Sequence, residues 1–200
     1  MFDWISTFIQ STGYLGVALL MFAENVFPPI PSELIMPLAG FNAAKGEMNL
    51  VLLVLFGSLG SLAGAFLWYA IARHLGIEFL KKAADRHGRW LALNRKDVDS
   101  TVEWFDNHGW WAVLIGRLVP AVRTLISVPA GLAKMRAITF LVYSAFGTVM
   151  WTSFLTATGY LLGSQYGVVQ VYLNPVTNVV VGLIVLGYLY RVVTWRSGTT

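Results

Sequence analysis

The chain has 200 residues, of which 56% are hydrophobic and only 12% charged, and its mean hydropathy is +0.65. A chain of this length usually forms a single domain. Soluble domains carry roughly 25% charged residues, so this composition predicts that the domain is embedded in a lipid bilayer. The absence of cysteine excludes disulfides and cysteine-based zinc sites, and a net charge of +4 is too small and too localised to indicate nucleic-acid binding.

The first predicted element, residues 13–45, begins as an apolar helix and is then interrupted by a polar segment that contains Pro28, Pro29 and Pro31. Proline costs about 3 kcal/mol in a helix interior, so no continuous helix is expected to pass through this segment. Irregular backbone is not tolerated against lipid, so the break must be covered by protein or line a wet cavity. We therefore predict a re-entrant helical hairpin here.

Residues 50–73 are predicted to span the membrane, because no charged residue occurs between Leu50 and Ala72. A helix of this length is long enough to cross a hydrocarbon layer of about 30 Å. Small residues lie along one side of this span, at Gly57, Gly60 and Gly64. Such spacing permits close helix packing, which we expect to be against the hairpin rather than in a dimer, although a homo-oligomer stays open.

Residues 74–108 form the one hydrophilic region, and the stretch that starts at Arg73 holds seven of the fourteen Lys and Arg residues. Val98, Val102 and Phe105 have the i, i+4, i+7 spacing of an amphipathic helix. We predict surface helices on the cytoplasmic face, with the C-terminus on the same side, because positive residues concentrate in the cytoplasm.

Residues 109–133 repeat the pattern of the first hairpin, with an apolar start and breaks at Pro120 and Pro129. Residues 138–163 then form an uncharged span, and residues 175–195, which end beyond Arg191, form the final span. The predicted fold is therefore an all-α, polytopic membrane protein. It contains two opposed re-entrant hairpins, about three full transmembrane helices and surface amphipathic helices.

Two parts of the chain, residues 13–76 and 109–163, resemble each other. Each opens with a glycine followed by an aromatic residue, places a charge after an apolar helix, and reaches a Pro-Ala-Gly-like sequence before a full span. The first hairpin is expected to open outside and the second inside, which makes an inverted repeat. Inverted repeats whose broken helices meet near the midplane are typical of transporters. The alternative is two unrelated hairpins that serve packing alone.

Four charged residues lie within apolar sequence: Glu24, Glu33, Arg117 and Arg123. Each costs about 2.5–3.5 kcal/mol at the membrane centre, so they must be paired or hydrated. A guanidinium fork suits phosphate, which makes the arginines candidate ligands of a lipid phosphate. The glutamates are candidate proton carriers, because burial and a nearby like charge both favour the protonated carboxyl group. The alternative is static Glu–Arg pairs that only hold the hairpins together.

Three motifs resemble those of the DedA family of membrane proteins. The first is Glu24-Asn-Val-Phe-Pro-Pro-Ile-Pro-Ser-Glu33, similar to the family's E-N-x-x-P-x-P-[GS]-[ED]. The second is the glycine-rich stretch 57–76, in which Ala72 stands where the family often has glycine. The third is Gly116-Arg-Leu-Val-Pro-Ala-Val-Arg123, followed by Pro-Ala-Gly. The resemblance covers residues 13 to about 163.

This resemblance implies a bacterial inner-membrane protein that moves polyprenyl phosphate (undecaprenyl phosphate) or phospholipid between leaflets and depends on the proton-motive force. Eukaryotic relatives with the same core resemble lipid scramblases. The family's functional acids correspond to Glu24 and Glu33, and its essential arginines to Arg117 and Arg123.

The alternatives are a proton-coupled exporter of small cations or drugs and a membrane-homeostasis protein without transport. A lipid phosphatase is not expected, because no histidine lies inside the membrane beside the arginines. We therefore expect no enzymatic activity, no metal and no cofactor, with lipid and protons as the partners.

Overall fold

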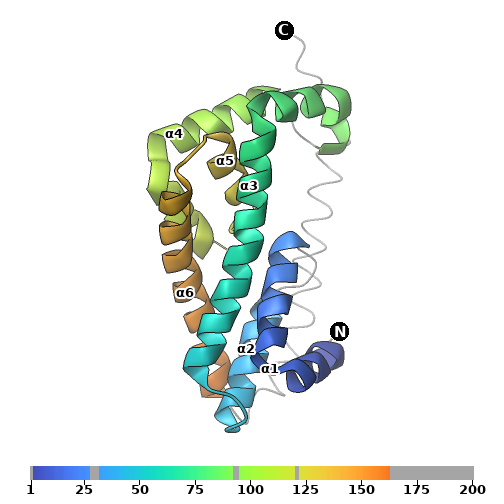
Figure 1. The fold of residues 1–200 in the computed structure, drawn as a ribbon, viewed down its shortest axis with the longest axis vertical. Helices are drawn as coiled ribbons and strands as arrows, with labels where there is room; N and C mark the ends of the chain where they lie inside the picture. Colours follow the sequence, from blue (N-terminus) through green and yellow to red (C-terminus); the bar gives the residue numbers. More distant parts are fainter. Residues whose placement is uncertain (1, 28–31, 92–94, 120–121, 163–200) are drawn as a thin grey trace.

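The computed structural model describes residues 2–27, 32–91, 95–119 and 122–162. Within these ranges the chain forms helices and no strand, which confirms the all-α prediction (Figure 1). The helices are α1 (Phe2–Val26), α2 (Ser32–Ala44), α3 (Leu50–Leu91), α4 (Arg95–Leu118), α5 (Ser127–Leu132) and α6 (Ala137–Leu162).

Three of the described helices contain stretches that are long and apolar enough to cross a membrane: Trp4–Val26, Leu50–Arg86 and Ala137–Leu162. The last two include most of the predicted spans 50–73 and 138–163. The predicted span 175–195 lies outside the described residues. Large apolar side chains are exposed along all three stretches, as lipid-facing surfaces require, among them Leu19, Leu59 and Phe146.

Helices α1 and α4 each contain a sharp bend at a glycine. Gly13 in α1 has φ 60° and ψ -138°, and Gly109 in α4 has φ 50° and ψ -126°, so both lie far outside helical geometry. Glycine adopts positive φ at no steric cost, which is why the chain turns at these two positions. The two apolar arms, residues 14–26 and 110–118, therefore begin at corresponding glycines, where the sequence predicts that they open.

The short helices occupy opposite ends of the bundle, while α3 and α6 run between the ends (Figure 1). Helix α2 and the apolar arm of α1 lie at one end, and α5 and the apolar arm of α4 lie at the other. Each short helix packs on the long helix of the other half of the sequence: α2 contacts α6, and α5 contacts α3. The arms instead pack within their own half, α1 on α3 and α4 on α6.

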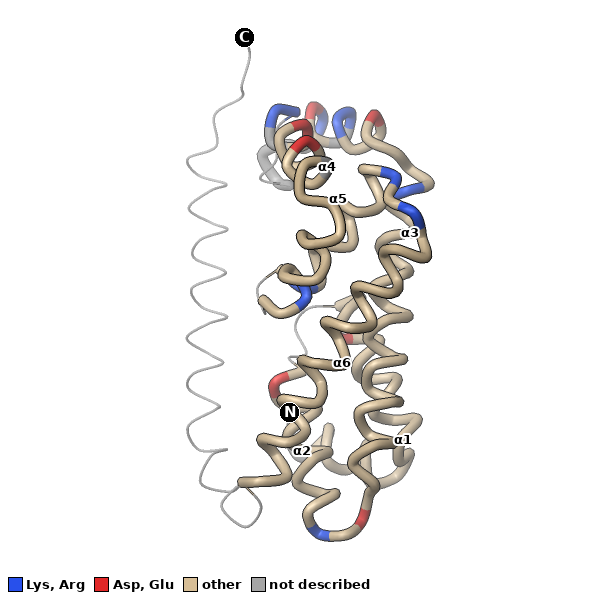
Figure 2. Tube along the Cα trace, turned by 90° about the vertical axis from the view of Figure 1, so that its left-hand side faces the viewer, with Lys and Arg blue, Asp and Glu red and all other residues tan. Residues whose placement is uncertain are grey.

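Charged residues gather at the end of the bundle formed by residues 77–91 and 95–108 (Figure 2). Helix α3 changes direction at Gly76, where φ is 73°, and the chain then runs across this end. The Lys81 Nζ atom lies 2.6 Å from Asp99 Oδ1, which joins α3 to α4. Val98 and Phe105, two positions of the predicted amphipathic pattern, are buried.

The glycines of α3 lie against α1 and α2. A Cβ atom at Gly60 would stand 2.0 Å from the carbonyl oxygen of Ala18, and one at Gly64 would stand 2.6 Å from Asn25 Cβ. A Cβ atom at Gly57 would meet the Met36 side chain at 2.8 Å. The absence of side chains at these positions therefore lets α1 and α2 approach α3 closely.

Replacing Gly60 by Leu should destabilise the protein by at least about 1–3 kcal/mol, the usual cost of overpacking, because the obstacle is backbone and not a flexible side chain. The measurement is the free energy of unfolding in detergent micelles. Ala63→Leu is the matched control, since Ala63 lies on the same turn of α3 but is exposed. Equal stability of the two variants would contradict this packing.

Candidate functional site

The four predicted charged residues lie between the two ends of the bundle, where the helices and turns from each end come closest to those from the other. Glu24 is in the last turn of α1 and Arg117 in the last turn of α4, with only 4% and 2% of their surfaces exposed. Arg123, 7% exposed, lies on the turns between α4 and α5. Glu33 is in the first turn of α2 and is only half-buried. Three of the four charged side chains are thus buried inside the protein.

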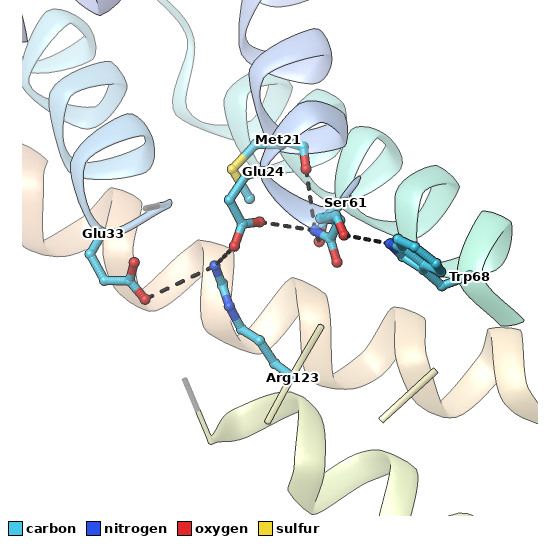
Figure 3. Close-up of polar contacts among 7 residues, drawn as sticks. Met21, Glu24, Glu33, Ser61, Trp68 and Arg123 are labelled. Atoms are coloured by element: carbon cyan, nitrogen blue, oxygen red, sulfur yellow. Dashed lines mark hydrogen bonds and ion pairs between the residues drawn. The ribbon is translucent and has the colours of Figure 1, made fainter. Parts of the chain in front are cut away.

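Arg123 links the two halves of the sequence. Its guanidinium donates a hydrogen bond to Glu24 Oε1, and the Nη2 atom of Arg123 lies 4.0 Å from Glu33 Oε1 (Figure 3). The Arg123 guanidinium also lies over the Trp151 ring of α6, 5.9 Å from its centroid. One arginine from the second half therefore faces both glutamates of the first half.

Asn25 holds the Glu24 carboxylate in place from the other side. Its side-chain amide nitrogen lies 3.0 Å from Glu24 Oε2 and 2.8 Å from Ser61 Oγ of α3. The Trp68 indole donates to the main-chain carbonyl oxygen of Asn25 at 3.1 Å (Figure 3). The end of α1 is thus fixed to α3. The Glu24 carboxylate is therefore contacted by Asn25 at Oε2 and by Arg123 at Oε1.

Arg117 has different surroundings from Arg123. Its Nη2 atom donates to Ser127 Oγ at 2.9 Å, and its guanidinium lies 5.7 Å from the centroid of the Phe140 ring. The Arg117 Nε atom is buried without a hydrogen-bond partner among the described residues. A Cβ atom at Gly147 would come within 2.7 Å of Arg117 Cβ, so the missing side chain in α6 leaves room for the arginine.

Of the prolines predicted to break the hairpins, Pro28, Pro29, Pro31 and Pro120 lie outside the described residues. Pro129 does not break a helix, because it is the third residue of α5. Proline is tolerated in the first turn, where its missing N–H would have no partner within the helix. In the second half of the sequence the helical structure is instead interrupted before α5, at the turns that carry Arg123.

Sequence reasoning did not find the buried hydroxyl groups of α3 and α6. Ser58 and Thr152 face each other across these helices, with their hydroxyl oxygens 2.8 Å apart. Thr148, Thr152 and Thr156 are all buried along one side of α6. Hydroxyl residues at a spacing of four within an apolar span were the signal that could have revealed a polar side facing the centre.

The VTT domain matches residues 30–161, which is well over half of the chain and includes three of the four charged residues. The chain belongs to the VTT domain family. This confirms the resemblance to DedA proteins that the motifs indicate. The VTT domain here comprises α2 to α6, so the arm of α1 that carries Glu24 lies before it.

Over most of its length the chain is similar in sequence to bacterial proteins. It is 34% identical to "Undecaprenyl phosphate transporter A" of Staphylococcus aureus (strain NCTC 8325 / PS 47), over 93% of this chain and 92% of that protein. It is 28% identical to the protein of the same name in Bacillus subtilis (strain 168), over 94% and 92% of the two chains.

Another relative is the "Alkaline phosphatase-like protein" of Lactococcus lactis subsp. lactis (strain IL1403), which is 36% identical over 89% of this chain and 83% of its own. No solved structure matches the chain. With its apolar helices and its bacterial membrane-protein relatives, the VTT-domain chain is a multi-pass membrane protein.

Proposed function

We propose that this protein moves lipids with an anionic phosphate headgroup between the two leaflets of the bacterial inner membrane. Undecaprenyl phosphate and phospholipids are the candidate substrates. The observation that carries the proposal is a pair of buried arginines, of which Arg123 contacts both glutamates and Arg117 is bonded to Ser127. The names of the Staphylococcus and Bacillus relatives support transport of a polyprenyl phosphate.

The proposed architecture is an inverted repeat, in which each unit consists of a re-entrant hairpin and a long helix. Support comes from corresponding glycines in the two units. A Cβ atom at Gly40 would lie 2.2 Å from the Thr156 carbonyl oxygen of α6, and one at Gly131 would lie 2.4 Å from the Tyr69 carbonyl oxygen of α3. Each short helix thus approaches the long helix of the opposite unit at the same point of its Pro-Ala-Gly-like sequence.

In the proposed mechanism, the arginines hold the lipid phosphate while the hydrocarbon tail stays in the bilayer. Protonation of Glu24 or Glu33 weakens their attraction for Arg123 and lets one unit rock against the other. Alternating access of this kind is the usual movement of transporters built from inverted repeats. The proposed orientation places residues 74–108 and the C-terminus in the cytoplasm, as the positive-inside rule favours.

Flipping of a fluorescent polyprenyl phosphate in vesicles that contain the purified protein tests the proposal. Arg117→Ala and Arg123→Ala should each slow flipping at least tenfold, because each removes a guanidinium from the phosphate path. Arg136→Ala is the matched control, since Arg136 is exposed and has no contact with the two glutamates in the described structure. Wild-type rates in both site variants would overturn the arginine roles.

The same vesicles separate the alternative functions. A proton-coupled exporter of cations or drugs would move a soluble cation and leave the lipid in place, and a homeostasis protein would move neither. The name of the Lactococcus relative raises the further alternative of a lipid phosphatase. Release of inorganic phosphate from the labelled lipid would identify that activity, and its absence alongside flipping would support transport.

A further inference from the structure

The two buried arginines differ in their counter-ions. Arg123 is bonded to Glu24 and faces Glu33, so its positive charge is already neutralised. No carboxylate in the described part of the chain lies within 4.0 Å of the Arg117 guanidinium. Arg117 is nevertheless the more deeply buried of the two. A buried guanidinium without an ion-pair partner is costly, which points to a site that accepts an anion.

Ser127 supplies the second group of this site. It is fully buried at the start of α5, and its Oγ atom accepts the hydrogen bond from Arg117 Nη2. A serine hydroxyl that accepts one hydrogen bond still has its own hydrogen to donate. The buried Nε–H of Arg117 is a further donor without a partner among the described residues. Arg117 and Ser127 therefore each keep a hydrogen available for donation, which suits the acceptor-only oxygens of a phosphate.

We propose that Arg117 and Ser127 form the resident subsite for the phosphate group, and that Arg123 is kept from it by Glu24 until that pair separates. This inference rests on the proposed function, since it names which groups hold the headgroup. It assigns a phosphate-binding role to Ser127. It also makes Arg123 a second phosphate ligand that is available only when its bond to Glu24 is broken, because one guanidinium cannot bind Glu24 and the phosphate equally well.

Equilibrium binding of dodecyl phosphate to the purified protein in detergent tests the subsite. Ser127→Ala should weaken binding about tenfold, the effect of losing one hydrogen bond to a charged group. Ser127→Thr keeps the hydroxyl and should restore most of the affinity. Thr158→Ala is the matched control, because Thr158 is half-buried and its hydroxyl donates to the Phe154 carbonyl of its own helix in the described structure. Dodecyltrimethylammonium, which lacks acceptor oxygens, should not compete.

Glu24→Gln tests the withheld arginine. It removes the charge that holds Arg123, so it should tighten binding of dodecyl phosphate several-fold, and adding Arg123→Gln should abolish that gain. Unfolding temperatures check that each variant is folded, and Ser127→Cys replaces Ser127→Ala if the latter does not fold. Unchanged affinity in Ser127→Ala, or in Glu24→Gln, would overturn the proposal.

Binding in detergent does not depend on transport, so the two proposals fail separately. A protein that binds dodecyl phosphate with this pattern but flips no lipid would overturn the transport function and leave the subsite intact. A protein that flips lipid while Ser127→Ala binds normally would overturn the subsite alone.

Discussion

Arg123→Leu is expected to lower the free energy of unfolding by about 3–5 kcal/mol, the usual cost of removing one partner of a buried ion pair. The loss is large because Glu24 would stay buried at the end of α1, where Asn25 holds it, and would face the apolar interior without a counter-ion. The measurement is denaturation of the purified protein in mixed micelles, followed by tryptophan fluorescence.

The double variant Arg123→Leu with Glu24→Leu should recover most of that stability, because no buried charge is then left alone and the leucines pack in an apolar setting. The exposed pair of Arg95 and Asp85 is the control, and Arg95→Leu should change stability little. If the double variant were as unstable as the sum of the single variants, Glu24 and Arg123 would not be coupled, and the contact would not join the two halves.

The sequence was informative about the charges because the membrane makes isolated charges expensive. Glu24 and Arg123 are 99 positions apart, yet their presence in apolar sequence was enough to predict that they need partners. It did not reveal which arginine meets which glutamate, since that depends on how the turns before α5 are packed. Nor did it predict the contact of Arg117 with Ser127, because a serine in apolar sequence carries no comparable penalty.

Helix boundaries were harder to predict than the bends. Glycine marks the bends at positions 13, 76 and 109, because only glycine readily adopts the positive φ found there. Helix α3, in contrast, does not stop at Arg73, where the uncharged run ends, but continues to Leu91. The charge of Arg73 ends the apolar run but not the helix, because its guanidinium donates a hydrogen bond to the Met135 carbonyl oxygen at 2.5 Å and is not left unpaired. Hydrophobicity therefore predicted where the membrane span lies but not where the helix ends.

A disulfide between Ser58→Cys and Thr152→Cys should reduce lipid flipping at least tenfold, and a reducing agent should restore it. Ser58 lies on α3 and Thr152 on α6, so the bond would join the long helices of the two proposed units at a point where their hydroxyl oxygens are 2.8 Å apart. If transport requires one unit to rock against the other, a covalent bond there blocks it. The measurement is flipping in vesicles before and after oxidation.

The natural chain contains no cysteine, so the pair can be introduced without removing any other thiol. Each single variant, oxidised in the same way, is the control for the loss of the hydroxyl–hydroxyl contact and for oxidative damage. Because these residues lie on the long helices and not among the four charges, the lock tests movement separately from phosphate binding. Equal flipping by the oxidised and reduced double variant would mean that lipid passes along a fixed path, and the two units would then serve as a static scaffold.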